Sequence, residues 1–321
     1  MRLSKTAAFY LQASIILFFL AGSSAPTPLY AVYQAAWGFS PITVTVVFGS
    51  YALAVLAALL VVGSLSDYIG RRPVLIAATV LQAVAMGIFA TAHGVGALLA
   101  ARIVQGISTG AAAGAVGAGL LDLDRVRGTL ANSIGPMLGT ATGGLLAGLM
   151  VAYLPAPTRL VYVVLAAIFV AQAIGVAMMP ESVTPRPGAL AALRPQVRLP
   201  REVRAPMLVA APVLIASWAL VGFYGSLGPA LLHRLAGSSS LALGGIVLFV
   251  LAAGGVVAVL ALRARSPRTL LTFGTAALVV GVAITLLAIA TIDGAPGAAR
   301  GAGAGALVVF FLGAVLAGAG F

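Results

Sequence analysis

Arg102 is a basic residue within an apolar stretch of the sequence, where basic residues are rare. Of the 321 residues, 18 are Lys or Arg and six are Asp or Glu, and there is no cysteine. Only Arg102 lies well inside a long apolar segment, three residues before Gln105. If that segment crosses a membrane, placing a charged side chain there costs at least about 2.5–3.5 kcal/mol of insertion free energy. Charged residues at such positions therefore usually have a function. We expect Arg102 to be functional; the alternative is that it snorkels to the membrane surface.

The partner of Arg102 cannot be an acid at the same depth. No Asp or Glu lies centrally in any apolar segment. The expected partner is therefore a polar side chain, a backbone carbonyl, a substrate or a group on helices beyond residue 321. One hypothesis is that the substrate or a co-ion is anionic. Measuring the affinity of the Arg102→Ala variant for anionic ligands would test it.

The composition requires a membrane environment. Apolar residues make up 62% of the chain and charged residues only 7%, against about 25% charged in soluble domains. A soluble enzyme, a disulfide scaffold and a disordered tail are excluded. The net charge of +12 comes from residues in short gaps between apolar runs, as in membrane topology. The bilayer is therefore an expected partner, and nucleic acid is not.

Ten segments have about the length needed to cross a bilayer as helices. They are continuous and show no alternation of period two, which predicts α-helices rather than strands of a barrel. The segments are 7–34, 42–62, 73–92, 97–121, 129–153, 159–179, 207–228, 241–262, 269–290 and 303–321.

The longest polar gap divides these helices into two groups. Residues 180–206 are rich in proline and contain five arginines, a composition typical of a linker. We predict a six-helix bundle over 1–179, a cytoplasmic linker over 180–206 and a second bundle over 207–321. Six helices followed by four are unbalanced, so we expect two more helices to follow Phe321.

The basic residues also predict an orientation. With the N-terminus in the cytoplasm, 14 Lys and Arg residues lie on that side, three lie outside and Arg102 lies within a helix. This bias predicts a multi-pass protein of the plasma or inner membrane with a cytoplasmic N-terminus.

The gap between the second and third helices contains a patterned loop. Gly63 allows a close helix approach, Asp67 and Arg71 stand four residues apart as helical ion pairs do, and Gly70 permits a turn with positive φ. Arg72 is explained more simply as an anchor in the cytoplasm.

This loop resembles the signature of the major facilitator superfamily, G-x-x-x-D-x-x-G-R-[RK], at all five fixed positions. The resemblance implies an all-α fold of two bundles with 12 helices. It also implies that Gly63, Asp67, Gly70 and Arg71 latch the cytoplasmic side, with Arg72 beside them.

Two further patterns fall in the fourth and fifth helices. Arg102, Gln105 and Gly106 resemble the family's R-x-x-Q-G pattern, and Gly110 continues a small-residue ridge at every fourth position. Gly135, Pro136 and Gly139 resemble the G-x-x-x-G-P-x-x-G-G pattern of proton-coupled drug exporters, although Ala131 and Thr140 replace two glycines. Pro136 favours a kink, and close packing explains this pattern equally well.

The family layout places helices 1, 4, 7 and 10 around a central cavity. For the tyrosines and Trp218, an aromatic belt at the membrane surface is the alternative. The resemblance implies the cavity residues Ser24, Thr27, Tyr30, Tyr33, Arg102, Ser217, Trp218 and Tyr224.

We therefore predict a secondary transporter that moves a small organic solute by alternating access, as a monomer and in the direction of efflux. Protons are a candidate coupling ion. The alternatives are a facilitator or uptake carrier for a sugar or organic anion, and a non-transporting scaffold or receptor. An enzyme is not expected, because the chain offers no nucleophile–base pair at one depth. No cofactor or metal is expected, since His93 and His233 fall in separate loops without a cluster of ligands.

Overall fold

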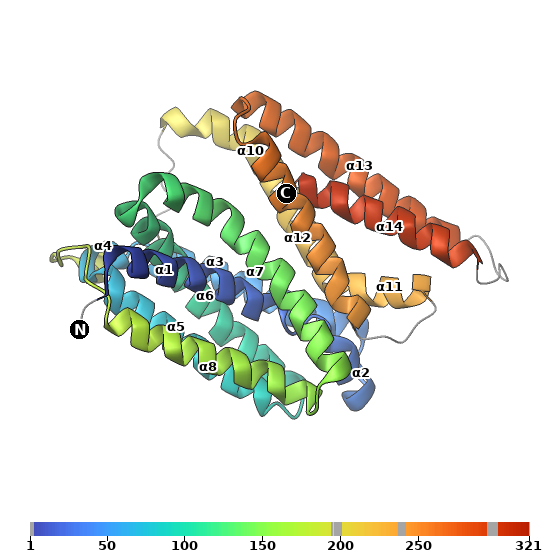
Figure 1. Cartoon of the computed structure of the whole chain (residues 1–321), viewed down its shortest axis with the longest axis horizontal. Coiled ribbons are helices and arrows are strands. Elements are labelled where there is room, and N and C mark those ends of the chain that lie inside the picture. The colour runs from blue at the N-terminus through green and yellow to red at the C-terminus, as the bar shows by residue number, and fades with distance from the viewer. Residues whose placement is uncertain (1–2, 194, 196–200, 237–241, 294–300, 321) are drawn as a thin grey trace. The chain divides into compact units, whose positions relative to one another are not determined.

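The structure is a computed structural model that describes residues 3–193, 195, 201–236, 242–293 and 301–320. These residues form helices joined by turns, with no strand among them (Figure 1). Within them, nine helices are long and apolar enough to cross a membrane, and the apolar stretch Gly305–Ala319 is shorter. The prediction of an all-α protein with about ten spans is confirmed. Residues 194 and 196–200 of the predicted linker lie outside the described residues.

The chain divides into two compact units. Unit 1 comprises Met1–Ser23, Trp37–Gly139 and Pro155–Arg198, and unit 2 comprises Ser24–Ala36, Thr140–Leu154 and Leu199–Phe321. The helices up to the linker are α1 (Lys5–Ser24), α2 (Tyr30–Trp37), α3 (Pro41–Val62), α4 (Ser66–Ile69), α5 (Arg71–Ala90), α6 (Val95–Leu123), α7 (Arg125–Tyr153), α8 (Pro157–Ala177) and α9 (Ala189–Ala192). Those after it are α10 (Arg201–Ser226), α11 (Gly228–Ala236), α12 (Ala242–Leu262), α13 (Pro267–Asp293) and α14 (Gly301–Ala319).

Local chemistry explains several helix starts. Ser40 caps α3, because its Oγ accepts the N–H of Thr43 at 3.3 Å, and Pro41 occupies the first helical position. Asp124 begins α7 in the same way, and its Oδ1 accepts the N–H of Val126 at 3.1 Å and of Arg127 at 2.9 Å. These caps satisfy N–H groups that have no carbonyl partner within their helix.

The first apolar segment is not one helix. The sequence predicted a single helix over 7–34, whereas the structure has α1, a turn over 25–29 and the short α2. Pro26 and Pro28 supply no N–H and restrict the residues before them. The prediction of a continuous helix was wrong at this point.

Within unit 1, α6 packs against both α3 and α5, and α5 also packs against α8 (Figure 1). Within unit 2, α14 packs in the same way against α12 and α13. In each unit, the last helix of such a triplet lies between the two that precede it. The two units thus share an order and packing of three helices, as internal repeats of transporters do.

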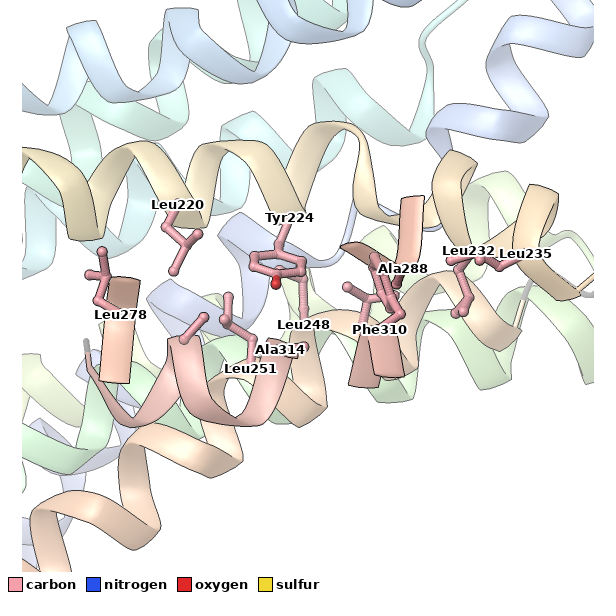
Figure 2. Packing of buried hydrophobic residues seen from close by; sticks show 12 residues of the cluster. Leu220, Tyr224, Leu232, Leu235, Leu248, Leu251, Leu278, Ala288, Phe310 and Ala314 are labelled. Atoms are coloured by element: carbon pink, nitrogen blue, oxygen red, sulfur yellow. The ribbon is translucent and has the colours of Figure 1, made fainter. Parts of the chain in front are cut away.

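Unit 2 has its own apolar core. Buried side chains from α10, α11, α12, α13 and α14 meet around Tyr224, Leu248 and Phe310 (Figure 2). The rings of Tyr224 and Phe310 meet edge to face, with centroids 5.9 Å apart, a geometry that aromatic pairs favour.

Candidate functional site

The end of α1 has two carbonyl oxygens without helical donors. The carbonyl of Gly22 would normally accept the N–H four residues later, but that residue is Pro26. The carbonyl of Ser23 would accept the N–H of Thr27, which instead donates to Ser24 at 3.0 Å. Buried carbonyls need partners, so this helix end requires donors from elsewhere.

Arg102 and Gln105 supply these donors from α6. Nη1 of Arg102 donates to the carbonyl of Ser23 at 2.8 Å and to Oε1 of Gln105 at 2.7 Å. Nε2 of Gln105 donates to the carbonyl of Gly22 at 3.0 Å. Both side chains are completely buried. Three residues apart on one helix, they cap the broken end of another, and we call this arrangement the α1 cap.

The charge of Arg102 suits this position. The C-terminal end of a helix carries partial negative charge, which a cation stabilises. The guanidinium carbon also lies 5.6, 5.4 and 5.9 Å from the ring centroids of Phe48, Tyr51 and Phe89, within the range of cation–π attraction. The buried guanidinium is thus held by the carbonyl of Ser23, the amide oxygen of Gln105 and three aromatic rings.

The guanidinium of Arg102 has partners within the protein. The partners include a backbone carbonyl and a polar side chain, two of the predicted kinds. Snorkelling is wrong for Arg102, because none of its surface is exposed. The hypothesis of an anionic substrate loses its premise, since the guanidinium already has partners within the protein.

Small residues of α6 let this helix approach α3. A Cβ atom on Gly106 would lie 2.6 Å from the carbonyl oxygen of Tyr51, and one on Gly110 would lie 2.6 Å from that of Val55. Such distances leave no room for a side chain. The ridge predicted from the sequence is therefore a backbone contact, as small-residue helix interfaces are.

Glycines of α7 likewise allow this helix to approach α1 closely. A Cβ on Gly135 would lie 2.8 Å from Cγ2 of Ile16, and one on Gly139 would lie 2.2 Å from the carbonyl oxygen of Leu17. Pro136 lies inside α7, which continues to Tyr153. The close packing is thus present, and a kink at Pro136 stays a prediction.

Arg71 is the centre of the patterned loop. Its Nη1 contacts Oδ1 of Asp67 and donates to Oγ of Ser66 at 2.7 Å, and its Nε lies 3.5 Å from Oδ2 of Asp122. Arg71 is buried, whereas both carboxylates are partly exposed. The helical spacing of Asp67 and Arg71 predicted the first pair, while Asp122 comes from the far end of α6.

Glu181 belongs to the same cluster and was missed in the sequence. Its carboxylate accepts the N–H of Arg71 at Oε1 and the N–H of Arg72 at Oε2, both at 2.9 Å. It therefore caps the first turn of α5, where negative charge is favourable. A Cβ on Gly70, whose φ is +101°, would lie 2.5 Å from Oε2. The available signal was that Glu181 is one of only six acidic residues in the chain.

The first half of the predicted linker is bound to this loop. The N–H of Arg186 donates to the carbonyl of Tyr68 at 2.9 Å, and its Nε donates to the carbonyl of Asp67 at 3.1 Å. The guanidinium of Arg186 also lies 5.5 Å from the ring centroid of Tyr68. Arg72 donates to the carbonyl of Ala177 at the end of α8, a contact that its interpretation as an anchor did not predict.

Replacing Glu181 with Gln should loosen the start of α5. The amide can accept only one of the two N–H bonds, and bonds to a charged group contribute about 1.5–3 kcal/mol. We expect hydrogen exchange at the amides of Arg71 and Arg72 to become at least about tenfold faster, as mass spectrometry of the purified protein would show. Glu202→Gln, an exposed change in the first turn of α10, is the matched control. Unchanged exchange in E181Q would contradict the cap.

The predicted cavity residues fall into different environments. In the first segment, Ser24, Thr27, Tyr30 and Tyr33 are all buried. In α10, Ser217 is buried and donates to the carbonyl of Val213 in its own helix at 2.8 Å, whereas Trp218 is 61% exposed. The role of these residues in a cavity stays a prediction.

Tyr224 lies in the core of unit 2. Its hydroxyl is 2.5 Å from Oγ1 of Thr285, which itself donates to the carbonyl of Gly281 at 2.9 Å. Because Thr285 has one hydroxyl hydrogen, Tyr224 donates in this pair. The residue thus joins α10 to α13 within the cluster of Figure 2.

Comparisons with known proteins agree with this architecture. The sequence model of the Major Facilitator Superfamily matches residues 13–321. No curated protein is significantly similar in sequence. The nucleoside transporter NupG (a D323A mutant) is similar in structure, with a TM-score of 0.70 at 14% identity over 99% of this chain and 79% of that one.

Two other solved structures resemble the chain. A bacterial homologue of the human lysosomal transporter Spinster, inward-facing and occupied, has a TM-score of 0.70 at 16% identity, covering 98% of this chain and 72% of that one. The human organic anion transporter MFSD10 (TETRAN) has a TM-score of 0.61 at 19% identity, covering 99% of this chain and 85% of that one. At these identities the likeness establishes the fold.

Proposed function

Because the chain belongs to the major facilitator superfamily, we propose that it exports a small organic solute by alternating access. It does so as a monomer in the plasma or inner membrane, with its N-terminus in the cytoplasm. Membership of the family supports membrane transport. The direction, the solute class and the membrane are parts of our proposal.

The α1 cap is the observation that carries this proposal. Transporters commonly build their central sites from interrupted membrane helices, whose freed backbone groups face the site. Here α1 is interrupted at Pro26, and two α6 side chains bind the carbonyls of Gly22 and Ser23. The break is thus a supported element of the fold, placed next to the predicted cavity residues Ser24 and Thr27.

The direction of transport depends on weaker support. Gly135, Pro136 and Gly139 follow the exporter pattern in part, and two of them meet α1 closely. The cluster around Arg71 gives the loop the contacts that a latch requires. We assign the cluster to the state closed toward the cytoplasm.

The positions of the acidic residues favour a second candidate, a facilitator without proton coupling. Proton-coupled carriers usually place carboxylates within membrane helices. Here all six acids lie at helix ends or in connections: Asp67, Asp122, Asp124, Glu181, Glu202 and Asp293.

Flux measurements in proteoliposomes distinguish these functions. We expect vesicles with the reconstituted protein to exchange an organic solute at least about tenfold faster than protein-free vesicles. The screened solutes are nucleosides, organic anions and lipophilic drugs, in part because the structural neighbours include a nucleoside and an organic anion transporter. Uphill movement driven by a pH gradient would identify a proton antiporter, and equilibration alone would identify the facilitator. Absence of flux for every solute would favour the scaffold or receptor and contradict the proposal.

A further inference from the structure

Unit 2 carries an open apolar groove. It has a volume of about 460 Å³ and lies between α12, α13 and α14. Its wall consists of α12 side chains from Phe249 to Leu262, Phe273 of α13, and Val315 and Ala319 of α14. None of the lining residues is polar. A polar group would lose its hydrogen bonds on entering, so the occupant of the groove must be hydrocarbon.

The length of the groove fits one leaflet of a bilayer. At 1.5 Å per residue, the α12 wall from Phe249 to Leu262 is about 20 Å long. Half of the hydrocarbon core measures about 15 Å. The groove is therefore long enough to hold an acyl chain that reaches from the membrane surface, at the end of α12, to the middle of the membrane.

Basic residues follow the groove's α12 wall in the chain. Arg263 directly follows Leu262 of the wall, Arg265 lies in the connection after α12, and Arg268 lies in the first turn of α13, the helix that contributes Phe273. All three arginines are exposed. Within the described residues, their side chains make no ion pair or hydrogen bond. Figure 1 shows the start of α13 and the C-terminal end of α14 at this same end of unit 2.

We infer that the groove binds one acyl chain of an anionic phospholipid, whose phosphate is held by Arg263, Arg265 and Arg268. The apolar wall matches the acyl chain of such a lipid, and the unpaired arginines match its phosphate. The predicted orientation puts this loop in the cytoplasm, where anionic lipid headgroups attract basic residues. A neutral lipid would fill the groove without using the arginines. This inference does not depend on the transported solute.

Lipid binding to the purified protein tests the inference. Native mass spectrometry after addition of phosphatidylglycerol or phosphatidylcholine gives the bound fraction of each lipid. We expect the wild-type protein to retain phosphatidylglycerol at least about fivefold more than phosphatidylcholine. In R263Q/R265Q this preference should disappear, while the apparent melting temperature without lipid stays the same. Equal retention of both lipids by the wild type would overturn the inference.

Two further variants separate this site from general surface attraction. R125Q/R127Q removes two exposed arginines from the first turn of α7, and we expect it to keep the preference. An equal loss in both double variants would mean unspecific attraction and would overturn the inference. Ala258→Phe fills the groove and should lower retention of both lipids. If it left retention unchanged, the acyl chain would lie elsewhere, or another copy or segment would occupy the groove.

Discussion

Arg102→Ala should reduce the rate of solute transport by about one to two orders of magnitude. The change removes the donor of Ser23 and of Gln105 Oε1 in a fully buried place, and each unsatisfied buried group costs about 1–3 kcal/mol. Arg102→Lys keeps the charge but lacks the planar fork, so it should recover only part of the rate. The measurement is solute flux in proteoliposomes at equal protein content, together with the apparent melting temperature.

A matched control lies about two turns away on α6. Ser108 is also fully buried and donates to the carbonyl of Ala78 at 2.7 Å, so its hydrogen bond goes to α5 and not to the end of α1. Ser108→Ala should lower the melting temperature slightly and leave transport within about twofold of the wild-type rate. If R102A transported as fast as S108A, the α1 cap would have no role in transport.

The proline of the break provides an independent check. Gln105→Ala leaves the carbonyl of Gly22 without its donor, whereas Pro26→Ala restores an N–H four residues after that carbonyl. The loss caused by Q105A should therefore be smaller in the P26A background, and a double-mutant cycle measures the difference. The same loss in both backgrounds would show that Gln105 does not act by capping α1.

Gly110→Leu should have the second large effect, on the stability of unit 1. A Cβ at residue 110 already lies 2.6 Å from the carbonyl oxygen of Val55 and from Cβ of Ala58, so α6 and α3 would have to separate. Overpacking of this kind costs about 1–3 kcal/mol or more, and the contact is between rigid backbones. We expect a fall of at least about 10 °C in apparent melting temperature and poor recovery of monodisperse protein.

Gly49→Leu is the control for this change. Gly49 lies in α3, and a Cβ there meets no atom within 4 Å. The helix propensity of glycine is low, so this variant should be as stable as the wild type or slightly more stable. Equal loss of stability in G49L and G110L would exclude the close contact as the cause.

Sequence patterns predicted the fold well because the bilayer allows few solutions. An apolar run of about 20 residues in lipid must satisfy its own backbone, so length and hydropathy alone located the helices. Glycines at every fourth residue likewise predicted where α6 meets a neighbour. The ion pair of Asp67 with Arg71 followed from local helical spacing.

The candidate site was harder to predict because its contacts join distant residues. Gly22 and Ser23 contribute carbonyl oxygens, which every residue has, so no side chain identified them as partners of Gln105 and Arg102. The break itself was visible in Pro26 and Pro28, but the apolar run on both sides favoured one long helix. Glu181 stood in a proline-rich gap, and its bonds to the start of α5 span 110 residues of sequence.

The buried guanidinium of the α1 cap has an electrical consequence. The guanidinium of Arg102 is a cationic group, and it lies about two turns inside the membrane helix α6. One elementary charge that crosses the full field at 100 mV changes energy by about 2.3 kcal/mol. If α6 shifts along the membrane normal between states, part of that energy enters their balance. The membrane voltage would then bias the cycle even when the carried solute is neutral.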